Sequence, residues 1–183
     1  VYCAHRFVNN EPFAVLLPDD IILGEPPCLQ QLVDAYQQKG AAIVAITEVP
    51  YQETGRYGIV EPAGDSSKSV FPVAGLVEKP DPSRAPSNLA VIGRYILLPE
   101  IMPVLARLSP GAGGEIQLTD ALHQLALQGK VYACRFKGQR FDIGEKIGFL
   151  QAMVEIALAR PDIADEFRRY LEERMRVLSS LGA

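Results

Sequence analysis

A strand–helix–strand pattern near the start of the chain sets the class of fold. Residues 13–18 (FAVLLP) and 41–49 (AAIVAITEV) are short apolar runs of the kind that form buried β-strands. Between them, residues 26–39 carry apolar side chains at helical spacing, and Gly40 follows as a typical helix stop. A strand, a helix and a second strand in this order predict a right-handed βαβ unit in a largely parallel sheet. The chain is therefore expected to be an α/β protein.

The rest of the sequence predicts further strands and helices in one continuous domain, without internal repeats or a long linker. Turn-forming residues surround short β-prone segments between 50 and 88, which predicts an antiparallel elaboration of the sheet. The other expected elements are strands at 89–98, at 131–136 and within 137–144, and helices at 99–108, at 118–128 and, broken at Pro161, from 145 to about 180. A glycine-rich connection at 110–115 leads into the helix at 118–128.

Composition and charge argue against some classes of binding partner and indicate where the protein is located. Eighteen basic residues against twenty-two acidic ones give a net charge of −4, whereas nucleic-acid-binding surfaces usually carry a basic excess, so no nucleic-acid partner is expected. The three cysteines are odd in number and far apart, which is typical of reduced thiols in a cytoplasmic protein rather than of zinc ligands. No apolar run approaches the roughly 20 residues that a membrane span needs, and no signal segment is recognised. We expect a cytoplasmic protein with no membrane partner.

Two aspartates at predicted strand ends are the first candidates for chemistry. Asp19 follows the apolar run 13–18, next to Asp20, and Asp142 ends the short run RFD before the last helices. Ligands of open α/β sheets bind outside the carboxyl ends of strands, so Asp19 and Asp142 can converge although they are far apart in sequence. Two carboxylates, together with phosphate oxygens and water, form a natural Mg²⁺ site. The same pattern also fits aspartates that cap helices or turns.

A second group of candidates surrounds the sequence VEKP at the end of a predicted strand. The Glu78 carboxylate can accept hydrogen bonds from neighbouring sugar hydroxyls, and the Lys79 ammonium can neutralise a phosphate. A solvent-exposed turn is the alternative interpretation of this pair. Gly58 and Gly93 interrupt strand-like runs, which predicts either the close approach of a ligand to the backbone or a structural bulge.

Motifs of covalent catalysis and of nucleotide-binding loops are missing from the sequence. There is no G-x-x-x-x-G-K-[ST] loop, no HExxH and no G-x-S-x-G. The two histidines, His5 and His123, lie near no serine or cysteine nucleophile pattern. A hydrolase with a nucleophilic triad is therefore not expected.

The candidate segments also resemble one known family. LLPDD, RYGIV, VEKP, APSNLAVIGRYIL, PGAGGEIQLTDAL and RFDIG occur in the order and spacing of the bacterial UTP–glucose-1-phosphate uridylyltransferases, or UDP-glucose pyrophosphorylases, over about residues 11–172. The resemblance implies a Rossmann-like nucleotide-diphospho-sugar transferase fold with a mixed, mostly parallel sheet, an antiparallel elaboration and C-terminal helices. It makes residues 1–183 the C-terminal part of a single sugar nucleotidyltransferase domain, with the sugar-binding half at about 41–144 and the helices at about 145–180.

The resemblance implies a reaction and the residues that carry it. Asp19 and Asp142 match the family's Mg²⁺-binding carboxylates, Glu78 the residue that holds glucose hydroxyls, and Lys79 the residue that contacts the sugar phosphate. The implied reaction is a Mg²⁺-dependent nucleotidyl transfer without a covalent intermediate. Glucose 1-phosphate attacks UTP in line, so that UDP-glucose forms and pyrophosphate leaves. The implied catalytic residues are Asp19, Lys79 and Asp142.

Three further positions are implied to bind substrate. Gly58 and Gly93 match backbone positions that line the glucose pocket, and Glu115 is placed near the sugar. Glu115 equally fits an acidic residue at a helix N-terminus. Members of the family form dimers or tetramers, so a homodimer or homotetramer is expected. The apolar stripe of the last helix would then be a subunit interface, although packing against the sheet is the alternative explanation.

The chain departs from the family at its start. The family's glycine-rich triphosphate loop, of the form GxGTRxxPxTKxxPKE, has no counterpart here, and the chain begins at Val1 rather than Met, which predicts a trimmed or partial sequence. We expect the intact protein to be the enzyme and this chain alone to bind UTP poorly. The alternatives are a related pyrophosphorylase that makes dTDP- or ADP-sugars, and a non-catalytic sugar-phosphate-binding or assembly module.

Overall fold

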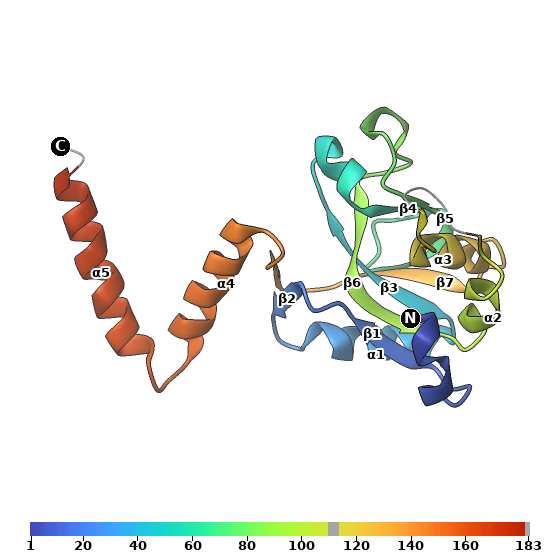
Figure 1. Cartoon of the computed structure of the whole chain (residues 1–183), viewed down its shortest axis with the longest axis horizontal. Helices are drawn as coiled ribbons and strands as arrows, with labels where there is room; N and C mark the ends of the chain where they lie inside the picture. The colour runs from blue at the N-terminus through green and yellow to red at the C-terminus, as the bar shows by residue number, and fades with distance from the viewer. Residues whose placement is uncertain (110–113, 182–183) are drawn as a thin grey trace. The chain divides into compact units, whose positions relative to one another are not determined.

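Residues 1–109 and 114–181 are described by the computed structural model shown in Figure 1. They fall into two units. Unit 1 comprises Val1–Pro18 and Ile22–Gln139, and unit 2 comprises Asp19–Ile21 together with the chain from Arg140 onward. Most of the glycine-rich connection expected at 110–115 lies outside the described residues.

Unit 1 is built on a six-stranded sheet, and a separate two-stranded sheet pairs β2 (Asp20–Leu23) with β8 (Gln139–Asp142). The spatial order of the six strands is β1 (Phe13–Leu16), β6 (Leu89–Leu97), β3 (Ala42–Glu48), β7 (Val131–Arg135), β5 (Val70–Glu78) and β4 (Gly58–Pro62). Among the described residues, short 3₁₀ helices lie outside the sheet at η1 (Tyr2–Phe7), η2 (Tyr51–Arg56) and η3 (Pro82–Arg84). The predicted α/β class and the mixed sheet are confirmed.

The direction of the strands corrects one part of the prediction. Strand β3 runs parallel to β7, whereas the other described pairings in the six-stranded sheet are antiparallel. In the described residues the sheet is therefore mostly antiparallel, not mostly parallel. An apolar run reports burial on both faces of a sheet and carries no information on strand direction. Strand β6 shows this, because it is apolar almost throughout and yet lies antiparallel to both β1 and β3.

The strand expected at 13–18 is also less buried than its composition indicates. Strand β1 lies at the edge of the sheet, and its side chains alternate between half-buried and exposed, with Leu16 50% exposed. Asp20 does not end this strand but begins β2, where it is buried. Apolar composition alone does not distinguish an edge strand from a central one.

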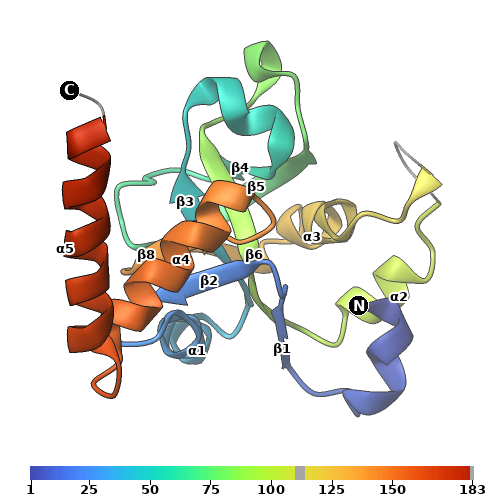
Figure 2. The ribbon, with the colours of Figure 1, turned by 60° about the vertical axis from the view of Figure 1, so that its left-hand side comes forward.

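Helices cover both faces of the six-stranded sheet (Figures 1 and 2). Helix α1 (Cys28–Lys39) packs its buried Leu32 against one face, beside Ile43. Helices α2 (Ile101–Leu105) and α3 (Leu118–Ala126) pack against the other face, where Leu122 and Leu125 are almost fully buried. Burying one such leucine side chain contributes roughly 1.5–3 kcal/mol, so α3 is firmly held on β5.

Unit 2 contains the last two helices of the described chain. Helix α4 (Lys146–Ala159) and helix α5 (Ala164–Leu181) are separated around Pro161, as the sequence predicts. Within the described residues, none of the helices has both the length and the apolar content that crossing a membrane would take.

The three cysteines differ in access, which gives a direct test of the fold. Cys3 is exposed, whereas Cys28 and Cys134 are buried, and burial raises the pKa of the Cys134 thiol to about 11. Because the thiolate is the reacting form, we expect iodoacetamide at about pH 8 to modify Cys3 in the native protein and all three thiols after unfolding. Peptide mass spectrometry measures the labelling, and rapid native labelling of Cys134 would contradict its buried position.

Candidate functional site

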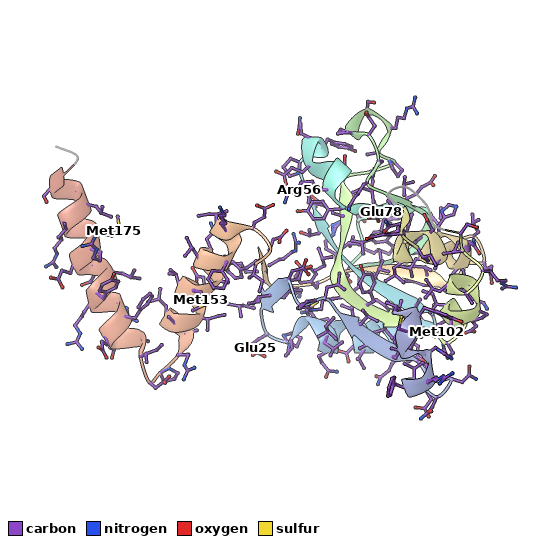
Figure 3. The ribbon with its side chains drawn as sticks, in the orientation of Figure 1. Glu25, Arg56, Glu78, Met102, Met153 and Met175 are labelled. Carbon is purple, nitrogen blue, oxygen red and sulfur yellow. The ribbon has the colours of Figure 1, made fainter. Side chains whose placement is uncertain are left out.

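The VEKP sequence lies where β5 ends, beside helix α3 (Figure 3). Glu78 is the last residue of β5 and faces Gly58 in the antiparallel pairing with β4. Its Oε2 accepts a hydrogen bond from the Thr119 hydroxyl at 2.5 Å, while its Oε1 lies 3.9 Å from Lys79 Nζ. One carboxylate oxygen is therefore tied to α3, and the other faces the ammonium group.

The backbone at Lys79 brings the acid and the lysine together. Consecutive residues of a strand point to opposite faces of the sheet. Lys79 leaves the strand conformation with a φ of +45°, and its N–H donates to the Tyr57 carbonyl at 2.9 Å. This left-handed conformation costs a residue with a side chain roughly 1–2 kcal/mol. Strain of this kind persists where the surroundings impose it, and it is concentrated at functional sites.

Gly58 permits a close approach between β4 and the pair on β5 and α3. A Cβ atom at position 58 would lie 2.9 Å from Thr119 Oγ1 and 3.2 Å from Glu78 Oε2. A side chain would therefore disturb the hydrogen bond that holds the carboxylate. The irregularity of β4 occurs at Glu61 and Pro62 instead, so close approach, not a bulge, is the structural role of Gly58.

The other two predicted sugar-binding positions are not joined to Glu78 by any contact found among the described residues. The Gly93 carbonyl accepts hydrogen bonds from the Leu17 N–H at 2.8 Å and from the Arg94 guanidinium at 2.9 Å. Glu115 is exposed and precedes α3, which begins at Leu118. It therefore lies outside the first turn of that helix.

The two distant aspartates meet in unit 2, as the sequence predicts. Asp19 directly precedes β2, Asp142 ends β8, and the Ile143 N–H donates to the Asp19 carbonyl at 2.8 Å. A Cβ atom at Gly144 would lie 3.2 Å from Asp142 Oδ1 and 4.0 Å from Asp19 Oδ2. Both carboxylates therefore border the same small space, which the glycine leaves open.

Arg140 supports this group and was missed by the sequence analysis. Its Nε donates to buried Asp20, and its Nη2 donates to Asp142 Oδ2 at 3.3 Å. The Gly144 N–H donates to the other oxygen of Asp142, Oδ1, at 3.2 Å. Arg140 and Asp142 are two positions apart on β8 and so share a face of the strand. That spacing is the signal in the sequence that would have found the arginine.

Gly148 is a second residue that the sequence analysis missed. It is buried in α4, and a Cβ atom there would overlap the carbonyl oxygen of Asp142. The helix can therefore pack directly against the backbone that carries the aspartate. A glycine inside a helix costs about 1 kcal/mol relative to alanine, so its presence was a usable signal of close packing.

The chemistry of the aspartate pair fits Mg²⁺. Carboxylate oxygens are hard ligands, and Mg²⁺ is usually held by one or two carboxylates with water and substrate phosphates completing the shell. In the described part of the chain, no group of three or more histidine, cysteine, aspartate or glutamate residues is arranged to hold a metal ion. Asp19 and Asp142, with the open space beside Gly144, suit an ion that takes its remaining ligands from phosphate and water.

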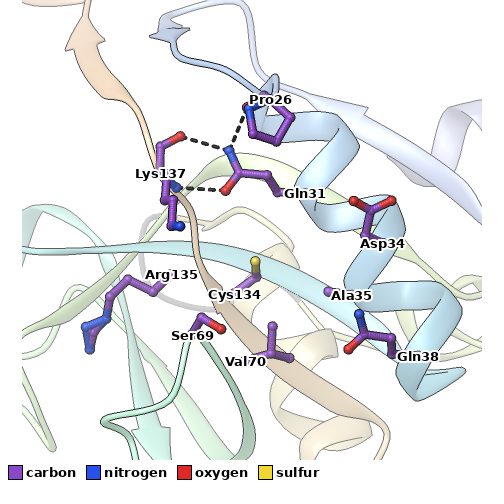
Figure 4. A pocket seen from close by; sticks show the side chains of 10 residues that line it. All are labelled: Pro26, Gln31, Asp34, Ala35, Gln38, Ser69, Val70, Cys134, Arg135 and Lys137. Carbon is purple, nitrogen blue, oxygen red and sulfur yellow. Dashed lines mark hydrogen bonds between the residues drawn. The ribbon is translucent and has the colours of Figure 1, made fainter.

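A separate hollow of about 290 Å³ lies between α1 and β7 in unit 1 (Figure 4). The Gln31 side chain closes one side of it, because its amide donates to the Lys137 carbonyl and accepts from the Lys137 N–H, both at 2.8 Å. The residues that the structure describes along this hollow include none of the predicted site residues.

The described residues thus combine a mixed sheet covered by helices with paired carboxylates and an acid–lysine pair at strand ends. A family model described as nucleotidyl transferase matches residues 1–158, and the chain belongs to that family. This confirms the fold class that the sequence motifs indicate.

Individual relatives narrow the similarity further. The UTP–glucose-1-phosphate uridylyltransferase of Staphylococcus epidermidis is 42% identical over 173 residues, which are 94% of this chain and 60% of that protein. The enzyme of the same name from Staphylococcus haemolyticus is 44% identical over the same shares. The resemblance inferred from the motifs is confirmed. The chain spans about 60% of the length of these curated relatives.

Solved structures give the same result. A UTP-bound UGPase from Acinetobacter baumannii superimposes with a TM-score of 0.83 and 37% identity, over 94% of this chain and 60% of the other. A UDP-glucose pyrophosphorylase complexed with UDP-glucose gives a TM-score of 0.81 and 39% identity, over 87% of this chain and 61% of the other.

Proposed function

We propose that the protein containing this chain is a UTP–glucose-1-phosphate uridylyltransferase, and that this chain supplies its glucose 1-phosphate and Mg²⁺ sites. The reaction joins UTP and glucose 1-phosphate to give UDP-glucose and pyrophosphate. The observation that carries the proposal is the identity of 42% to an enzyme of that name over 94% of the chain. The geometry at Glu78 and Asp142 supports it, because each site offers groups that suit one part of the reaction.

The Glu78–Lys79 pair suits a sugar phosphate. The half-buried Glu78 carboxylate can accept hydrogen bonds from two sugar hydroxyls, and the more exposed Lys79 ammonium can neutralise a phosphate beside them. Bringing two phosphate groups together is the main obstacle to the reaction, because unit charges 4 Å apart near a protein surface repel by roughly 4 kcal/mol. A fixed ammonium lowers that repulsion without forming a bond to either substrate.

We assign Asp19 and Asp142 as the residues that would hold Mg²⁺. When bound, the ion supplies positive charge to phosphate oxygens and aligns them. Arg140 keeps Oδ2 of Asp142 engaged, so that Oδ1 is the oxygen beside Gly144 and Asp19. The chain's own contribution is thus to hold the Asp142 carboxylate beside that of Asp19 before any ligand arrives.

The full-length protein should be assayed with glucose 1-phosphate, Mg²⁺ and each of UTP, dTTP and ATP. We expect the highest kcat/KM with UTP, and UDP-glucose as the product. A preference for dTTP or ATP would replace the proposal with a related sugar nucleotidyltransferase. Binding of glucose 1-phosphate by calorimetry with no product from any nucleotide would favour the non-catalytic sugar-phosphate-binding module.

We also propose that the protein is a homodimer or homotetramer in which a second copy covers part of unit 2. Helix α4 exposes four large apolar side chains within seven residues, Ile147, Phe149, Leu150 and Met153, and α5 exposes Tyr170, Met175 and Leu178. Figure 3 labels Met153 on α4 and Met175 on α5. A group of large apolar side chains exposed together commonly marks a contact surface, so we expect α4 to be covered by another surface.

Light scattering after gel filtration tests this oligomer. The wild-type protein should elute as a dimer or tetramer, and Leu150→Asp should shift it to the monomer because a carboxylate is costly to bury in an apolar contact. Gln151→Asp, at an exposed polar neighbour on the same helix, is the matched control and should leave the mass unchanged. A monomeric wild-type protein would show that α4 is covered within its own chain.

A further inference from the structure

We propose that Thr119 is a positioning residue that fixes the Glu78 carboxylate for binding the sugar. The inference rests on the proposed function, since it takes Glu78 as the group that meets the sugar hydroxyls. Its own basis is a hydrogen bond between two elements that are far apart in the sequence, β5 and α3. None of the motifs considered in the sequence assigns a role to this threonine.

The hydrogen bond gives the two oxygens of the Glu78 carboxylate different partners. The Thr119 hydroxyl has a single proton, and it donates that proton to Glu78 Oε2 at 2.5 Å. A distance this short is typical of strong hydrogen bonds from a hydroxyl to a charged carboxylate. Oε1 remains on the Lys79 side, 3.9 Å from Nζ. The threonine thus fixes the orientation of the carboxylate, with one oxygen on α3 and the other toward the lysine and its ligand.

Helix α3 is a rigid support for this hydroxyl. Thr119 lies in the first turn of α3, and the helix is anchored on the sheet by Leu122 and Leu125, each 1% exposed. A glutamate side chain has several rotatable bonds, and a free one must lose that freedom when a ligand binds. The hydroxyl removes part of this loss in advance, which is how supporting residues preorganise a binding site.

Gly58 leaves room for the same arrangement from the β4 side. A Cβ atom there would come within 3.2 Å of Glu78 Oε2 and within 2.9 Å of Thr119 Oγ1. The position of the Glu78 carboxylate is therefore set from two sides. Gly58 on β4 leaves room for it, and the Thr119 hydroxyl on α3 binds it.

The test replaces Thr119 in the full-length protein with valine, which keeps the shape but has no hydroxyl, and with serine, which keeps the hydroxyl. For Thr119→Val we expect KM for glucose 1-phosphate to rise about tenfold, the factor that corresponds to the loss of one hydrogen bond to a charged group. KM for UTP and the melting temperature should remain near wild type. Thr119→Ser should restore KM for glucose 1-phosphate to within about threefold of wild type.

A second comparison asks whether the effect passes through Glu78. In a Glu78→Ala background, Thr119→Val should add little further loss, because the carboxylate that the hydroxyl positions is already absent. A wild-type KM for glucose 1-phosphate in Thr119→Val would overturn the inference while leaving the proposed function intact, and so would an equal rise in both KM values with a lowered melting temperature. A wild-type protein that makes no UDP-glucose would instead overturn the proposed function, and the inference with it.

Discussion

Replacing Asp142 with asparagine is expected to lower Mg²⁺-dependent UDP-glucose formation by about a thousandfold, because a metal-held charge contributes several kcal/mol to such a reaction. Asparagine has nearly the same shape, and its one oxygen can accept one of the two hydrogen bonds that Asp142 receives, from Arg140 at Oδ2 or from the Gly144 N–H at Oδ1. The loss should therefore come mainly from charge and not from misfolding. Steady-state kinetics over a range of Mg²⁺ concentrations measures it, and circular dichroism checks the fold.

The matched control for Asp142 is Asp162→Asn. Asp162 is an exposed aspartate between α4 and α5, in the same unit, and it pairs with Arg160 at 2.7 Å. This variant removes the same charge at a position well separated in sequence from Asp19 and Asp142. It should therefore keep wild-type turnover. Near-normal kinetics of Asp142→Asn at limiting Mg²⁺ would refute the metal assignment.

Replacing Lys79 with glycine is expected to separate activity from stability. Loss of the ammonium should reduce kcat/KM for glucose 1-phosphate by roughly a hundredfold, the equivalent of about 3 kcal/mol of phosphate stabilisation. Stability should hardly change. Glycine adopts the φ of +45° freely, and relief of roughly 1–2 kcal/mol of strain offsets the 0.5–1 kcal/mol or so that glycine costs through the unfolded chain.

Lys79→Ala provides the matched comparison for this prediction. Alanine also removes the charge, so its activity should fall as far as that of Lys79→Gly. It keeps a Cβ atom in the left-handed conformation, so its free energy of unfolding should be about 1 kcal/mol lower than that of the glycine variant. Urea unfolding of both proteins measures the difference. Full activity in either variant would remove Lys79 from the phosphate site.

Elements with a strong local pattern could be predicted from the sequence. Helix α1, with its apolar spacing and final glycine, and strand β3, with its continuous apolar run, lie within one or two residues of their predicted bounds. Strand β2 was missed because its four residues, DIIL, are too short to show an alternating pattern. A mostly parallel sheet was predicted wrongly, since strand direction depends on which strands meet in three dimensions. The antiparallel pairing of β4 with β5 agrees with the elaboration predicted between residues 50 and 88.

In the candidate site, too, some residues could be predicted from the sequence and others could not. Asp19, Asp142 and Glu78 could be singled out because charged residues that end apolar strands are visible in sequence. Thr119 could not, because its role exists only through a tertiary contact. Arg140 left a signal in its spacing from Asp142 on one strand, but its contact with Asp20 is also tertiary. Thr119 is 41 positions from Glu78, and Arg140 is 120 positions from Asp20. Only the folded chain brings these supporting groups to the carboxylates that they hold.

A crystal structure of the full-length protein with UDP-glucose and Mn²⁺ tests the central claim most directly, because Mn²⁺ takes the same oxygen ligands as Mg²⁺ and is located by its anomalous scattering. The expected result is one Mn²⁺ bound by Asp19 and Asp142, with the hexose hydroxyls hydrogen-bonded to Glu78. A metal ion bound away from both aspartates, or a hexose that does not touch Glu78, would contradict it.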